Sequence, residues 1–86
     1  MTIHEIQSRN HSATVRRGLL SEFTTKQEFI LKMYEEVAEF ARTETDEHEA
    51  EELADIVIVC LTCAKHYGID IMNELRKKTL KNEGRQ

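Results

Sequence analysis

The chain has 86 residues, a formal net charge of −4, no proline and only three glycines. This composition favours helices joined by short turns and argues against a sandwich or barrel. No stretch approaches the roughly 18 apolar residues of a membrane span, and an acidic chain is poorly suited to duplex DNA, whose binding depends on phosphate neutralisation. The first residues lack a basic segment followed by an apolar one. We therefore expect a cytoplasmic protein without a membrane or nucleic-acid partner.

Capping patterns predict four helices along the chain. A side chain able to accept hydrogen bonds from the first helical turn precedes each of them, at Thr2, Thr25, Asp46 and Asp70. The predicted helices cover residues 3–17, 26–43, 47–67 and 71–83. Glycines are well placed to end the first, third and fourth helices. These elements use the whole length, so we expect residues 1–86 to form a single all-α domain.

The third predicted helix is apolar almost all round between Leu53 and Ala64. A helix of that kind lies at the centre of a bundle or at the interface of an oligomer. Because so short a chain can hardly surround it, we expect a homodimer or homotetramer that completes the bundle. Cys60 and Cys63 lie in this apolar run, and no second pair exists to complete a zinc site. We interpret them as buried core thiols.

Two acidic pairs are the most informative motif of the chain: Glu36-x-x-Glu39 and Glu52-x-x-Asp55. The i,i+3 spacing places both carboxylates of a pair on one side of a helix. Two such helices packed side by side would bring four carboxylates together, and like charges that close repel unless a cation lies among them. A hard divalent cation with oxygen ligands meets that need, and we expect Mg²⁺.

Helical projection ranks the acidic side chains by how far they point toward the core. Glu52 falls within the apolar face of its helix, with Asp55 beside it, and a core-facing glutamate is costly unless it is paired or coordinated. Glu36 falls at the edge of its apolar face, whereas Glu35 falls opposite and should be solvated. The alternatives are a solvated face for Glu36 and Glu39, and a buried salt bridge for the other pair. Its partner would be Lys65 or Lys78.

A stripe of polar side chains follows one edge of the fourth predicted helix. Lys78, Asn82 and Arg85 have i, i+4, i+7 spacing, which aligns two cations and an amide. Such groups can hold phosphate oxygens together with a base or a sugar. Basic residues near the C-terminal end of a helix are also favoured by the helix macrodipole alone, so this second interpretation stays open.

The two acidic pairs and their spacing resemble the EExxE…ExxD signature of the MazG-like all-α nucleoside triphosphate pyrophosphatases. The match consists of Glu35-Glu36-Val37-Ala38-Glu39, a gap of twelve residues, and Glu52-Leu53-Ala54-Asp55. The wider context is similar too, with Gly68-Ile69-Asp70 after the apolar helix and a Lys-rich helix that ends Lys81-Asn82-Glu83-x-Arg85. The resemblance covers roughly residues 26–86.

The resemblance implies an enzyme that hydrolyses the α–β phosphate bond of a nucleoside triphosphate. It implies that Mg²⁺ is held by the four carboxylates, which would also be the catalytic residues: Glu36, Glu39, Glu52 and Asp55. It implies that Lys78, Asn82 and Arg85 contact the nucleotide. Members of the family often carry an aromatic residue, commonly tryptophan, on the first helix, and this chain offers Gln7, Asn10 and His11 there instead. The alternative is a helical nucleotide-binding or dimerisation module without turnover.

Overall fold

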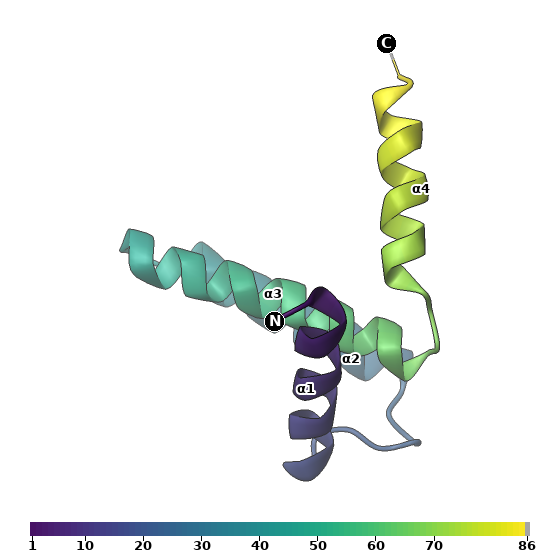
Figure 1. Ribbon diagram of the computed structural model, residues 1–86. Coiled ribbons are helices and arrows are strands. Elements are labelled where there is room, and N and C mark those ends of the chain that lie inside the picture. Colours follow the sequence, from purple (N-terminus) through teal and green to yellow (C-terminus); the bar gives the residue numbers. More distant parts are fainter. Residues whose placement is uncertain (86) are drawn as a thin grey trace.

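The computed structural model of the protein describes residues 1–85 and contains four helices (Figure 1). They are α1 (Ile3–Arg16), α2 (Lys26–Ala41), α3 (Asp46–His66) and α4 (Ile71–Glu83). No strand occurs in this part of the chain, so the predicted all-α class with four helices is confirmed. No helix among the described residues is both long and apolar enough to cross a lipid bilayer.

The starts of the helices follow from their caps. Thr2 and Glu5 form a reciprocal capping box at α1, and the hydroxyl of Thr25 accepts from the backbone N–H of Glu28. The predicted cap of α3 at Asp46 is wrong by one residue. The hydroxyl of Thr45, in extended conformation, accepts from the N–H of His48 at 3.2 Å. Asp46 therefore lies inside the first turn, where its negative charge faces the positive end of the helix dipole.

Helices α2 and α3 pack side by side as a helical hairpin, and α1 lies across α3 (Figure 1). The buried apolar side chains are few, as expected for so short a chain, and they are Leu20, Phe29, Leu61 and Ala64. A buried polar contact joins α1 to the middle of α3, where Gln7 Nε2 donates to the carbonyl oxygen of Leu61 at 2.7 Å. This contact fixes the position of α1 against the hairpin.

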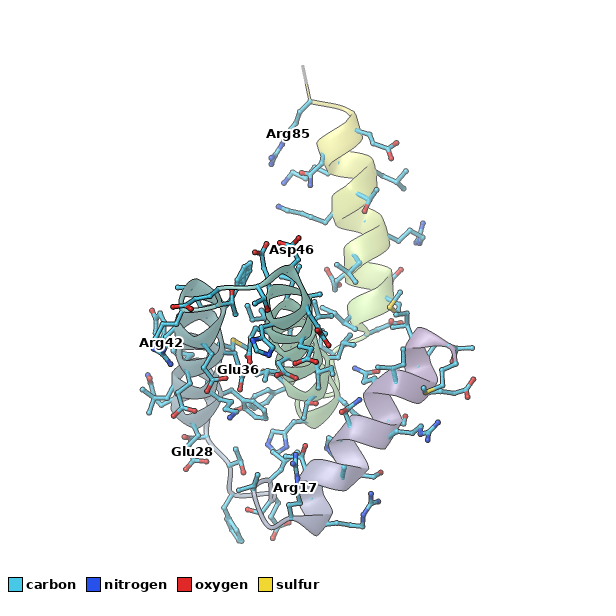
Figure 2. All side chains as sticks on the ribbon, turned by 90° about the vertical axis from the view of Figure 1, so that its left-hand side faces the viewer. Arg17, Glu28, Glu36, Arg42, Asp46 and Arg85 are labelled. Atoms are coloured by element: carbon cyan, nitrogen blue, oxygen red, sulfur yellow. The ribbon has the colours of Figure 1, made fainter. Side chains whose placement is uncertain are left out.

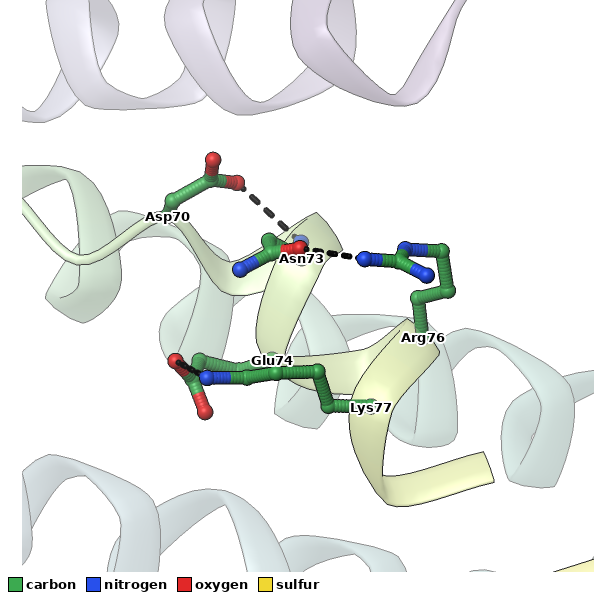
Figure 3. A network of polar contacts seen from close by, with 5 residues as sticks. All are labelled: Asp70, Asn73, Glu74, Arg76 and Lys77. Atoms are coloured by element: carbon green, nitrogen blue, oxygen red, sulfur yellow. Dashed lines mark hydrogen bonds and ion pairs between the residues drawn. The ribbon is translucent and has the colours of Figure 1, made fainter. Parts of the chain in front are cut away.

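Helix α4 extends away from the other three helices (Figure 1). The chain turns at Gly68, whose φ of +66° is readily adopted only by glycine, and Asp70 caps the new helix as predicted. None of the residues of α4 is buried. Its side-chain contacts are local: Asp70 accepts from the N–H of Asn73, Arg76 donates to the Asn73 side chain, and Lys77 pairs with Glu74 (Figure 3). Within residues 71–85, only the side chains at the start of α4 are half-buried, so the helix packs against the rest of the protein there.

A large apolar surface of the hairpin is exposed. Tyr34 and Val37 on α2 are 69% and 52% exposed, and Leu53 and Val57 on α3 are about half exposed. Cys60 is also exposed, so the prediction that it is a buried core thiol is wrong, whereas Cys63 is half-buried. The apolar character of α3 therefore exceeds what one copy of the chain can cover. Oligomerisation stays a prediction.

Candidate functional site

The two acidic pairs meet where α2 and α3 face each other. Glu36, Glu39 and Glu52 each offer a carboxylate oxygen, and these three atoms lie within 4.8 Å of one another. Two come from consecutive turns of α2 and the third comes from α3, as the i,i+3 spacing predicts. The hairpin alone is sufficient to form this cluster. It requires no residue from α1 or α4.

Glu36 is the most buried member, with only 6% of its surface exposed (Figure 2). Its Oε1 lies 3.0 Å from the ammonium of Lys32, one turn earlier on α2. Its Oε2 is buried and has no hydrogen-bond partner within residues 1–85. The predicted ranking, in which Glu52 points inward and Glu36 lies at an edge, is therefore reversed. The projection of a single helix takes no account of its neighbour. In the hairpin, Glu36 at the edge of α2 is covered more completely than Glu52 on the face of α3.

Glu52 is half-buried, and its Oε2 also lacks a partner in the described part of the chain. Burial raises the pKa of this carboxyl above its usual range, and the nearby charge of Glu39 raises it further. Asp55 and Glu36 add smaller effects in the same direction. No ion pair joins Glu52 to either of the two lysines considered as salt-bridge partners, within the residues that the structure describes. The buried salt bridge considered as an alternative is therefore not formed within the described residues of one chain.

Asp55 lies beside the group of three rather than within it. Its side chain is exposed, but its charge contributes to the raised pKa of Glu52, which places it nearby. Glu35 is exposed, as expected for a solvated side chain, and its Oε2 lies 3.5 Å from Lys32 Nζ. The sequence signature therefore separates into three clustered carboxylates, one adjacent carboxylate and one surface residue.

The cluster has the chemistry of a hard-cation site. Buried carboxylate oxygens without donors are costly, because desolvation of a charge is not offset by a hydrogen bond. Within residues 1–85, the buried carboxylate oxygens without a partner belong to Glu36 and Glu52, which lie on facing helices. Mg²⁺ is bound through carboxylate oxygens and keeps several waters. The donor set therefore fits Mg²⁺, and Glu36, Glu39 and Glu52 are the residues that would hold it.

The carboxylates separate two hollows of the surface. A cleft of about 760 Å³ lies between α1 and the hairpin, and Glu36 and Asp55 line it together with Asn10, Arg17, Phe29 and Thr62. A shallower hollow of about 430 Å³ lies at the loop end of the hairpin, where Glu39 and Glu52 are joined by Arg42 and His48. A ligand can therefore reach the cluster from two sides.

The sequence did not reveal several residues of these hollows. Arg17, Arg42 and Thr62 lie outside any motif, and only the packing of α1 on α3 brings Arg17 and Thr62 to one cleft. Of the polar groups expected on the first helix, Asn10 lines the cleft. The side-chain amide of Gln7 instead donates to the carbonyl oxygen of Leu61. His11 is half-buried near Lys65 and His66. Burial lowers the pKa of its imidazole, and the charges of Lys65 and His66 lower it further.

The predicted substrate stripe is not brought to the carboxylates within one chain. Lys78, Asn82 and Arg85 are all exposed on α4 or just beyond its end, and none of them lines either hollow. Figure 2 shows Arg85 at the free end of the α4 segment, far from Glu36 between α2 and α3. If these three residues contact a nucleotide at the cluster, α4 must come from elsewhere or change position.

Fold and site together define an all-α protein with a carboxylate cluster suited to a divalent cation. The model of the MazG-like family matches residues 26–86, which include both acidic pairs and α4. The chain therefore belongs to the MazG-like family, which is generally a family of pyrophosphohydrolases that use a divalent metal. Comparisons with curated proteins and with solved structures gave no match. Helix α1 lies outside the matched residues.

Proposed function

We propose that the protein is a cytoplasmic Mg²⁺-dependent nucleoside triphosphate pyrophosphohydrolase. It would convert an NTP or dNTP to the corresponding monophosphate and pyrophosphate. The observation that carries this proposal is the pair of buried, unpartnered carboxylate oxygens on Glu36 and Glu52, in a cluster with Glu39. Membership of the MazG-like family supports the reaction class.

The four carboxylates divide between two tasks in this reaction. Glu36, Glu39 and Glu52 would hold Mg²⁺, which supplies positive charge to neutralise the triphosphate. Asp55 is exposed to the cleft and is outside the group of three. It is therefore suited to orient a water molecule and to accept its proton while the water oxygen attacks a phosphorus atom of the α–β linkage. The α–β phosphoanhydride bond then breaks, and pyrophosphate leaves.

A second copy of the chain would complete the substrate site. Lys78, Asn82 and Arg85 lie apart from the cluster, while α4 carries exposed Leu75 and Leu80 and the hairpin carries its own exposed apolar face. Burial of these surfaces between copies would be favourable by roughly 25 cal/mol per Å² of apolar area. We propose a homodimer or homotetramer in which the partner's α4 approaches the cluster and its basic stripe binds the nucleotide phosphates.

A nucleotide screen tests the proposed activity directly. Purified protein is incubated with each of the eight common NTPs and dNTPs in Mg²⁺, and the products are separated by ion-exchange chromatography. We expect monophosphate and pyrophosphate from at least one nucleotide, and none when EDTA replaces Mg²⁺. Release of orthophosphate with a diphosphate product would instead indicate cleavage of the β–γ bond and would contradict the proposed reaction.

A nucleotide-binding or dimerisation module without turnover is the second candidate. The distance of the α4 stripe from the cluster within one chain favours it. Calorimetric titration with a nucleoside triphosphate separates the two candidates. Binding with no product from any nucleotide, at an affinity unchanged by Glu52→Gln, would support the module and rule out the enzyme.

A further inference from the structure

Two polar side chains of α1 face α3 where the two helices pack. Gln7 is buried, and its amide donates to the carbonyl oxygen of Leu61. His11 is half-buried, and it lies one turn further along α1 on the same side of the helix as Gln7. Lys65 and His66 follow Leu61 by about one turn of α3, and both lie close enough to His11 to lower its pKa. The docking surface of α1 therefore includes one hydrogen bond and, one turn later, a group of three basic side chains.

His66 is held in this group by aromatic rings. Its imidazole centroid lies 5.3 Å from the ring of Phe29 and 4.9 Å from the ring of Tyr67, which it meets edge-on. Phe29 is itself one of the few buried apolar side chains. His66 therefore has little freedom to move away from His11. Lys65 is exposed, so its long side chain can keep the ammonium in water.

The surroundings of His11 disfavour the charged form of its imidazole. Burial is the largest cause of the lowered pKa, because a buried charge loses its hydration. The positive charges of Lys65 and His66 lower the pKa further. Both belong to α3, the helix on which α1 packs. No carboxylate within residues 1–85 contributes to the pKa of His11, and the one acid of α1, Glu5, belongs to the capping box at its start.

The docking of α1 also shapes the cleft beside the carboxylate cluster. Asn10, Thr14 and Arg17 form the wall that α1 and its end supply. Asp55 and Ile58 belong to the facing wall, which α3 supplies. The cleft therefore exists only while α1 lies against α3, and any group that controls this docking also controls how open the cleft is.

We propose that His11 is a pH-sensitive switch, which docks α1 on α3 when it is neutral and releases α1, opening the cleft, when it is protonated. Histidine is the side chain whose charge ordinarily changes close to neutral pH. Because docking lowers the pKa of His11, the docked form binds fewer protons than the released form. Docking is therefore strongest above the ordinary histidine pKa of about 6.5. It weakens as pH falls through that value toward the lowered one. The switch requires neither a metal nor a nucleotide.

Hydrogen exchange of the metal-free protein tests the switch, because the amides of α1 exchange when the helix leaves α3. Exchange is followed by mass spectrometry between about pH 7.5 and about pH 5.5, and each rate is divided by the intrinsic rate at that pH. We expect the protection of α1 to fall severalfold as pH falls, by less than about tenfold per pH unit, the limit for one proton. The protection of α2, which packs on the same α3, is the internal reference and should not fall with it.

Three variants separate His11 from other sources of pH dependence. His11→Gln keeps a polar side chain that stays neutral, so the protection of α1 should no longer depend on pH. His4→Gln is the matched control, because His4 lies on the same helix but is exposed, and it should keep the wild-type dependence. Lys65→Gln removes one facing cation and should make the dependence shallower without abolishing it, since burial is the larger cause.

Protection of α1 that does not change with pH in the wild type would overturn the inference. An unchanged dependence in His11→Gln would overturn it too. If His11→Gln leaves α1 undocked at every pH, titration of the wild-type His11 imidazole by NMR decides. A pKa below the ordinary histidine value, together with pH-dependent protection of α1, supports the switch, and a pKa at or above that value overturns it.

Discussion

The α2–α3 hairpin and helix α4 carry the two halves of the predicted site, the carboxylates and the basic stripe, and the two differ in how they pack. The hairpin brings Glu36, Glu39 and Glu52 together within one chain. Helix α4 has no buried residue, and its polar side chains contact one another instead of the hairpin (Figure 3). Both halves lie inside the residues that match the MazG-like family.

In the proposed enzyme, this difference would separate metal binding from nucleotide binding. Carboxylates on two adjacent helices joined by a short loop meet through local packing, so one chain suffices to form the carboxylate cluster. Cations on an isolated helix meet the cluster only through a further contact, either with a second copy or by movement of α4. Variants of the two regions should therefore have different effects on metal affinity and on catalysis.

The largest effect is expected from Glu36→Gln, which breaks the hairpin half. It removes a charge from the most buried carboxylate, and we expect Mg²⁺ affinity and hydrolysis to fall about 100-fold or more. Titration calorimetry with Mg²⁺ and the nucleotide assay measure the two losses. Glu35→Gln is the matched control, since Glu35 also contacts Lys32 but is exposed. Equal losses in both variants would show that the cluster is not the metal site.

A smaller effect is expected from Lys78→Ala and Arg85→Ala, which break the α4 half. Loss of one charge-assisted phosphate contact should lower kcat/KM about tenfold, with Mg²⁺ affinity changed less than about twofold. Steady-state kinetics and metal titration provide both values. Lys77→Ala is the control, because Lys77 Nζ forms an ion pair with Glu74 Oε1 at 3.0 Å on the same helix.

Mixing the two classes of variant sharpens the comparison. If the partner's α4 serves the cluster, an inactive Glu36→Gln chain mixed with an Arg85→Ala chain forms hybrid sites with both halves intact. Activity of the mixture should then exceed the sum of its components. No recovery, with exchange of subunits verified by native mass spectrometry, would indicate that α4 serves the cluster of its own chain.

The smallest effect is expected in the pH dependence of the metal-free protein. The pKa of Glu52 is raised in the folded state, so the folded protein binds more protons than the unfolded chain between the ordinary and the raised value. The contribution of Glu52 to stability is then greatest below the ordinary glutamate pKa and is lost as pH rises through the raised one. Urea denaturation across this range measures the slope, and Glu52→Gln should reduce it. A steeper fall of stability in Glu52→Gln than in the wild type would show that burial and the neighbouring carboxylates do not raise the pKa of Glu52.

Local signals explain what the sequence predicts well. The caps at Thr2, Thr25 and Asp70 fix three helix starts because each satisfies backbone N–H groups within its own turn. The position of Asp70 also predicts where α4 begins. The same local logic brings the carboxylates together, since i,i+3 spacing sets a face and a short loop makes the two helices neighbours.

Non-local packing explains what the sequence does not predict. Glu36 is more buried than Glu52 because of how α3 lies on α2, which projection of either helix alone cannot give. Cys60 is exposed because one copy of the chain leaves the outer face of α3 uncovered. Thr62 and Arg17 share a cleft only because α1 crosses α3 there, held in part by Gln7. None of these facts has a periodic signature.

The ion pair between Lys32 and Glu36 supplies the metal-free cluster with an internal counterion. Lys32 lies one turn before Glu36 on the same helix, so this ammonium cannot diffuse away. It holds one oxygen of Glu36 and leaves the other unpartnered. The hydrogen bond with Glu36 raises the pKa of Lys32, which keeps the ammonium charged. A divalent ion bound as proposed would therefore enter a site whose negative charge is already partly balanced by one lysine that is not a ligand.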